Sequence, residues 1–155
     1  MIAITIHDDF HGKVNPEFLE KIAGAVLGYT DSDESTDKGV NLSIVIESDE
    51  TLKSLNAQYR QIDKVTDVLS FPADEVDPET GVRYFGDVIL SLEQAGKQAD
   101  KTGHQLEDEV ALLVVHGVLH LLGYDHDTPE NKQLMWATQR ELLDSLGFTN
   151  LIIPE

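Results

Sequence analysis

Residues 105–122 constrain the fold more than any other part of the chain. The segment is long enough for a helix and apolar on most sides, with Val110, Leu112, Leu113, Val114, Val115, Leu119 and Leu122. A helix that is apolar all round is buried, because each of its faces needs apolar neighbours. We therefore predict a buried central helix that the other elements surround. Gly123 is expected to follow its end, since glycine readily adopts the left-handed conformation found there.

The other segments predict strands and helices in mixed order. Alternating β-branched residues and short apolar runs predict strands within residues 1–9, 40–46, 68–71 and 84–91, with Pro72 ending the third. Capping residues predict helices from 16 past 27, from 48 to near 62, from 91 to about 102 and from 129 to 146. Residues 29–39 and 74–81 are expected to be surface loops.

The order of these elements predicts the fold class. Four strands and about five helices without a βα repeat favour an α+β fold with a small, mixed four-stranded sheet. The chain has 155 residues, of which 41% are hydrophobic and 26% charged. These values are typical of one globular domain, and we assign residues 1–155 to a single domain.

Composition excludes several classes of protein. The chain has no cysteine, so disulfide frameworks, cysteine zinc sites and thiol nucleophiles are excluded. No apolar run approaches the ~20 residues of a membrane helix, and none follows a basic N-terminus as in a signal peptide. We therefore expect a cytoplasmic protein that does not enter membranes.

The charge balance is strongly acidic. With 11 basic and 29 acidic residues, the formal net charge is −18. Such a surface repels nucleic acid at long range unless its few cations are clustered. The balance alone therefore counts against a nucleic-acid role, and solvated surface acids explain most of it.

Three of the six histidines predict a metal site. His116 and His120 lie four residues apart on the central helix, so their rings project from one face. Gly123 allows a sharp turn that returns His126 towards that face. The spacing H-x-x-x-H-x-x-G-x-x-H is that of the metzincin zinc site. Three imidazoles leave one tetrahedral position for water or substrate, whereas a structural site is normally closed by a fourth protein ligand.

The residue after His116 argues against a peptidase. Zinc peptidases with this spacing carry a glutamate there as general base, and here the position is Gly117. Glu109 shares the helix face, but seven residues at about 1.5 Å each put it too far from His116. Metal-assisted chemistry on another substrate remains open. The other histidines, His7, His11 and His104, lack such spacing and are interpreted as ordinary loop residues.

Arg60 is the cation best suited to an anion. Its planar guanidinium can bind phosphate through two parallel hydrogen bonds, and it follows Tyr59 just before a strand. Lys53 and Lys64 could extend a stripe with it, but a solvated lysine face is the favoured interpretation of these two. Another pair, Lys97 and Lys101, has the i, i+4 spacing of an exposed helix face.

Several segments together resemble the YbeY endoribonuclease family, bacterial factors for rRNA maturation. Residues 116–126 resemble its HGxLHLxGYDH signature. Residues 55–60 resemble its LNxxYR segment, residues 66–72 its TDVLSFP segment and residues 86–88 its GDI strand. Val65 departs from the family, which commonly has proline there, and this changes loop stiffness more than chemistry.

The resemblance implies a zinc-dependent, single-strand-specific endoribonuclease in small-subunit rRNA maturation and ribosome quality control. It implies one Zn²⁺ per chain, or another divalent transition metal, on His116, His120 and His126. It also implies Arg60 and His116 as catalytic residues, with Arg60 binding the substrate. The expected partners are single-stranded rRNA and ribosomal or ribosome-assembly proteins.

Two alternatives remain at this stage. The chain could be a ribosome-assembly factor whose zinc site is mainly structural, or a metallopeptidase, which Gly117 disfavours. The sequence leaves open the oligomeric state, the cleavage position, the metal loaded in cells, and the general base and nucleophile.

Overall fold

A computed structural model describes residues 1–30, 39–149 and 151–153. The strands are β1 (Ile2–Ile6), β2 (Leu42–Glu47), β3 (Val68–Val76) and β4 (Arg83–Ser91). The helices are α1 (Pro16–Tyr29), α2 (Asp49–Arg60), α3 (Leu92–Thr102), α4 (Leu106–Leu121) and α5 (Pro129–Ser145). A short 3-10 turn, η1 (Asp8–Phe10), follows β1. Most of the predicted loop at 29–39 lies outside the described residues.

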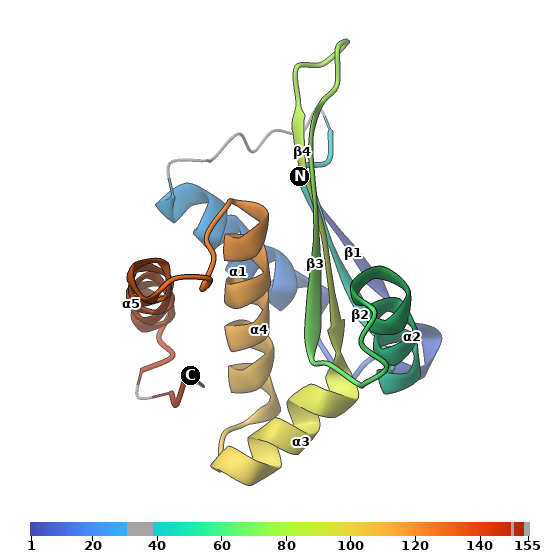
Figure 1. The fold of residues 1–155 in the computed structure, drawn as a ribbon, viewed down its shortest axis with the longest axis vertical. Helices are drawn as coiled ribbons and strands as arrows, with labels where there is room; N and C mark the ends of the chain where they lie inside the picture. The colour runs from blue at the N-terminus through green and yellow to red at the C-terminus, as the bar shows by residue number, and fades with distance from the viewer. Residues whose placement is uncertain (31–38, 150, 154–155) are drawn as a thin grey trace.

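The four strands form one mixed sheet in the order β1-β2-β4-β3. The pairs β1–β2 and β2–β4 are parallel, and β3 runs antiparallel to β4. Helices α1 and α4 lie on one face, with α5 outside α4, and α2 lies on the opposite face (Figure 1). The predicted α+β class with a mixed four-stranded sheet and five helices is confirmed. Among the described residues, no helix combines the length and apolar character needed to cross a membrane.

Helix α4 is the central helix, as predicted. It packs on α1, α3 and α5 and on strands β3 and β4. Its fully buried side chains include Val114, Val115, Val118 and Leu119. These residues meet the inward face of the sheet, where Leu42, Ile44, Ile46, Val88 and Leu90 alternate with more exposed positions. Burial on several sides follows directly from the apolar surface around the helix.

The predicted end of the third strand at Pro72 is wrong. Strand β3 continues through Pro72 to Val76, so the predicted loop at 74–81 begins later than expected. Proline lacks the N–H that a central strand needs, but β3 pairs only with β4 and lies at the sheet edge. The register shifts between Pro72 and Glu75, which accommodates the proline.

The predicted helix starts are confirmed by their caps. The side chains of Asn15, Ser48, Ser91 and Thr128 each accept a backbone N–H at the start of α1, α2, α3 and α5. Such caps satisfy donors that the first helical turn leaves unpaired. Gly123 has a φ of 98°, in the left-handed region predicted for it.

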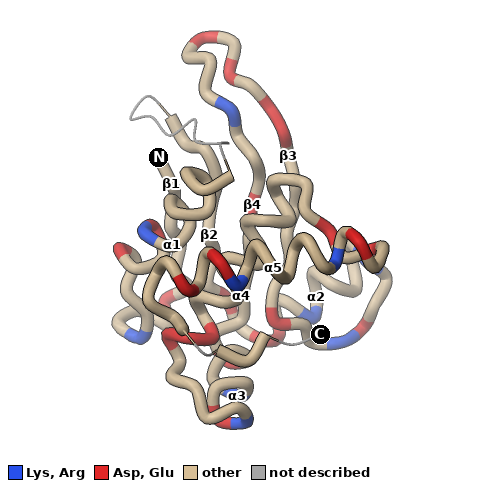
Figure 2. The backbone as a smooth tube through the Cα atoms, turned by 90° about the vertical axis from the view of Figure 1, so that its left-hand side faces the viewer, with Lys and Arg blue, Asp and Glu red and all other residues tan. Residues whose placement is uncertain are grey.

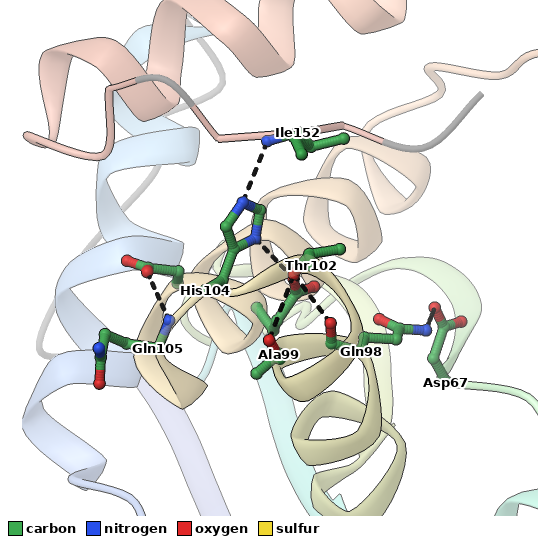
Figure 3. A network of polar contacts seen from close by, with 9 residues as sticks. Asp67, Gln98, Ala99, Thr102, His104, Gln105 and Ile152 are labelled. Carbon is green, nitrogen blue, oxygen red and sulfur yellow. Dashed lines mark hydrogen bonds and ion pairs between the residues drawn. The ribbon is translucent and has the colours of Figure 1, made fainter.

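His104 lies in the loop between α3 and α4, as predicted, but its side chain makes structural contacts there that the sequence did not indicate. Its Nδ1 lies 2.7 Å from Oε1 of Glu109, and its Nε2 accepts the N–H of Ile152 at 3.3 Å (Figure 3). The Glu109 side chain is only 2% exposed. This pair joins the start of α4 to the C-terminal segment. His7 and His11 are exposed residues beside η1, as expected of loop histidines.

Candidate metal centre

Three histidine side chains converge at the C-terminal end of α4. His116 and His120 lie one helical turn apart, and His126 returns to them in the segment after Gly123. One ligand nitrogen from each of the three lies within 4.8 Å of the others. The Nε2 atoms of His116 and His120 lie 3.1 Å apart. The predicted histidines are therefore brought together.

This donor set fits a transition metal such as zinc. With Zn–N distances of about 2.0–2.1 Å, two tetrahedral ligands are about 3.3 Å apart, close to the separation of the His116 and His120 nitrogens. Among the described residues, no further His, Asp or Glu joins the cluster. Three imidazoles leave one position for water or substrate, as in catalytic zinc sites.

Gln139 on α5 orients the first of these histidines. Its Oε1 lies 2.6 Å from Nδ1 of His116. An amide oxygen can only accept, so Nδ1 carries the proton and Nε2 presents its lone pair to the cluster. Metal-bound histidines commonly donate their other N–H in this way.

Electrostatics keep the first two histidines neutral. Burial lowers the pKa of His116, although the bond to Gln139 and the charge of Asp67 partly oppose it. Burial, His116 and His126 together lower the pKa of His120 to about 4. Only neutral imidazole can bind a metal, so both side chains are in the binding form at neutral pH.

The three histidines open into a cavity of about 530 Å³. Its wall comprises Arg60, residues 66–70 and Pro72 from the α2–β3 region, and residues 123–126 after α4. Asp67 and Ser70 contribute polar groups to this wall. Ser70 also donates to the backbone oxygen of Gly117 at 2.9 Å, which ties β3 to α4.

Arg60 is placed on this cavity by the end of α2. It is the last residue of the helix, and Gln61 ends the helix in the left-handed conformation at φ 56°. Tyr59 contacts Phe71 of β3 edge-on, with ring centroids 5.3 Å apart. Arg60 is exposed. Arg60 and the three histidines therefore line one cavity, while the catalytic role of Arg60 stays a prediction.

The other predicted cations lie away from the cavity wall. Lys53 is 4.0 Å from the carboxylate of Asp63. Lys97 pairs with Asp49 at 3.3 Å, and Lys101 lies in the last turn of α3. Lys64 is exposed in the segment after α2. The described cavity residues include only Arg60 among these cations.

Packing explains why the peptidase glutamate is missing. A Cβ atom at Gly117 would lie 2.6 Å from Cγ1 of Val88 and 3.3 Å from Cγ2 of Val68. The helix approaches the sheet so closely there that Val88 would have to shift to admit a side chain. Glu109 cannot replace that base, because its carboxylate accepts from Thr102 and contacts His104 at the other end of α4.

Sequence reasoning missed three residues around the site. Asp67 lies in the cavity wall, Gln139 bonds His116, and Trp136 contacts the rings of both His116 and His126 edge-on. One signal for Gln139 was available. Gln139 falls on the same face of α5 as Met135, Leu142 and Leu143. A polar side chain on a buried face needs a hydrogen-bond partner in the interior.

Comparison with known proteins identifies the family. The family model described as Endoribonuclease YbeY matches residues 4–147. Endoribonuclease YbeY of Persephonella marina is 39% identical over 134 residues, covering 86% of this chain and 84% of its own. The protein of the same name from Limosilactobacillus reuteri is 36% identical, with coverage of 94% and 98%.

A solved structure supports the fold. The solution structure of TM1509 from Thermotoga maritima aligns over 97% of this chain and 94% of its own, with a TM-score of 0.58. The sequence identity is 24%, so this likeness concerns the fold alone. The family model and the curated relatives cover most of the chain. The chain therefore belongs to the YbeY endoribonuclease family.

Proposed function

We propose that this endoribonuclease is zinc-dependent, cleaves single-stranded RNA, and acts in small-subunit rRNA maturation and ribosome quality control. The observation that carries the proposal is the shared cavity, which the three histidines and Arg60 line together. An RNA phosphate is an anion that Arg60 and a metal held by the imidazoles could both bind.

His116, His120 and His126 would hold the metal. A zinc ion there would supply a Lewis acid for a phosphoryl oxygen and would lower the pKa of a bound water to about 7. Arg60 would bind the phosphate oxygens through its planar fork and stabilise the charge that develops during cleavage. Gln139 keeps His116 in the required tautomer and orientation. Arg60 thus binds substrate, and His116 serves catalysis as a metal ligand.

The acidic charge bears on how RNA arrives. Acidic residues are distributed over the described backbone, including the hairpin that joins β3 and β4 (Figure 2). A chain of net charge −18 repels RNA at long range. We propose that RNA is met locally at the cavity and is delivered on the ribosome or by a ribosomal or assembly protein. A cytoplasmic location follows from this proposed substrate.

A direct test compares cleavage of three substrates. A labelled single-stranded rRNA fragment, the same fragment annealed to its complement, and a peptide mixture are incubated with zinc-loaded protein. We expect cleavage of the single strand only, loss of cleavage after chelation, and recovery when zinc is restored. An assembly factor with a structural site would retain zinc without cleaving RNA. Cleavage of peptides would instead support a metallopeptidase.

A further inference from the structure

A second cavity lies beside His116, and His120 does not line it. It has a volume of about 190 Å³ and is lined by Asp67, Val68, Gln98, Leu112, Leu113, His116, Trp136, Gln139 and Ile153. It shares Asp67, Val68 and His116 with the larger cavity of the metal centre. A ligand in the second cavity would therefore lie next to a ligand bound at the metal centre.

One wall residue has a buried donor without a partner. Gln139 is 0% exposed, and its Oε1 is occupied by His116. Its Nε2 has no hydrogen-bond partner among the described residues. A buried donor left unpaired destabilises the fold, so such groups call for an explanation. A ligand acceptor in the adjoining cavity would satisfy it.

Asp67 supplies an acceptor on the same cavity. Nε2 of Gln98 donates to Oδ2 of Asp67 at 2.9 Å, and Thr102 donates to the backbone oxygen of Gln98 at 2.8 Å (Figure 3). These contacts fix the carboxylate from the side of α3. Gln139, with its amide donor, and Asp67, with its carboxylate acceptor, therefore line the same small cavity.

The remaining wall is apolar and partly aromatic. Leu112 and Leu113 come from α4, and the half-buried ring of Trp136 comes from α5. Apolar walls with a few placed polar groups are typical of sites for small organic ligands. A flat heteroaromatic ring could pack its faces against these apolar side chains and direct its polar edge towards Gln139 and Asp67.

We propose that this cavity binds one unpaired nucleobase of the RNA strand, next to the phosphate held at the metal centre. The Watson–Crick edge of every base carries an acceptor beside a donor, which suits Gln139 Nε2 and the Asp67 carboxylate. A base engaged through that edge cannot be paired with a second strand. The cavity would thus supply the preference for single strands, an inference that rests on the proposed function.

The first test uses Trp136, the only tryptophan of the chain. Zinc-loaded protein is titrated with a nucleoside 5′-monophosphate, which cannot be cleaved as RNA, and with ribose 5-phosphate, which lacks the base. We expect the nucleotide to change Trp136 fluorescence in a saturable way and the sugar phosphate to leave it unchanged. Equal responses to both ligands would overturn the proposal.

The second test replaces each base of a short single-stranded substrate in turn by an abasic residue. We expect one position at which kcat/KM falls about ten- to hundredfold, the range for a lost base–aromatic contact, while other positions change little. If RNA is cleaved but no position stands out, the base site is wrong and the proposed function survives. If no RNA is cleaved, the fluorescence test still decides whether the cavity takes a base.

A cavity-filling variant links the effect to this wall. Leu113→Phe places a larger side chain at a residue that lines the cavity, and Leu134→Phe makes the same change at a 60% exposed position on α5. In Leu113→Phe, abasic replacement at the sensitive position should no longer lower kcat/KM. The zinc content of the variant should equal that of wild type. Leu134→Phe should behave as wild type. If Leu113→Phe fails to fold, the abasic scan with wild-type protein decides alone.

Discussion

Gln139 Oε1 and His116 Nδ1, 23 residues apart in the chain, lie 2.6 Å apart in the folded protein. This bond makes α5 part of the metal centre, although α5 contributes no ligand. Replacing Gln139 by leucine should weaken zinc binding about ten- to a hundredfold, the range for loss of such a support. Competition with a chromophoric chelator measures this affinity.

Stability separates this role from simple packing. Gln139→Leu removes the unpartnered Nε2 but leaves Nδ1–H of His116 without its acceptor. The two effects oppose each other, so the free energy of unfolding of the metal-free protein should change little. Gln139→Glu keeps an acceptor for His116, so its zinc affinity should be close to that of wild type and well above that of Gln139→Leu. Gln133→Leu, exposed on the same helix, is the control. Unaltered affinity in Gln139→Leu would show that the bond does not support the metal.

His120→Ala should abolish tight zinc binding, because two imidazoles alone are a poor site. Elemental analysis of purified wild type and variant measures the zinc content per chain. His7→Ala removes an exposed histidine outside the cluster and should leave zinc content unchanged. Equal zinc in wild type and His120→Ala would contradict the assignment of the ligands.

Arg60→Lys should reduce RNA cleavage roughly ten- to a thousandfold, the range for losing one charge-stabilising contact. Lysine provides a point charge in place of the planar fork. Zinc content and thermal stability should barely change, since Arg60 is exposed and is no ligand. Arg83→Lys makes the same change in the β3–β4 hairpin and should cleave normally. Equal rates for wild type and Arg60→Lys at full zinc occupancy would remove Arg60 from the site.

Local signals predicted much of this molecule. The caps at Asn15, Ser48 and Thr128 and the spacing of the histidines depend on residues a few positions apart, so periodicity and side-chain chemistry identify them. The apolar surface of α4 likewise predicts its central place. These features need no knowledge of the tertiary fold.

The missed features depend on contacts between distant segments. Pro72 was expected to end a strand, but it lies on a sheet edge that only the strand order reveals. His104 acquires its role from the C-terminal segment, through the N–H of Ile152. Gln139 and Trp136 reach the metal centre because α5 lies beside α4. Pattern reasoning on one sequence cannot supply such packing.

Acid should weaken the junction of α2 and α3 through Asp49. Burial alone would raise the pKa of this carboxyl, but hydrogen bonds from Ser91, Gln94 and Lys97 lower it below its usual 3.8. The folded state then binds its proton less readily than the unfolded state. The contribution of Asp49 to stability is therefore full above about pH 4 and is lost as pH falls through the folded pKa.

Denaturant unfolding of metal-free wild type and Asp49→Asn across pH 2.5–7 tests this. The difference in free energy of unfolding should be largest at neutral pH and should shrink below pH 4. Asp100→Asn on the exposed side of α3 controls for the loss of one negative charge. A difference that does not depend on pH would show that the Asp49 charge is not what stabilises the junction.

Gly117→Ala should destabilise the fold even though alanine favours helices. The new Cβ would meet Val88 Cγ1 at 2.6 Å, and this valine is fixed in a central strand. Overpacking of this kind costs about 1–3 kcal/mol, against a helix-propensity gain of up to about 1 kcal/mol. Gly96→Ala in α3 has no atom within 4 Å of its new Cβ and should be stabilising. Thermal unfolding of the two metal-free variants should therefore shift in opposite directions from wild type. A higher melting temperature for Gly117→Ala would mean that α4 can move away from the sheet, and that a side chain after His116 is excluded by something other than packing.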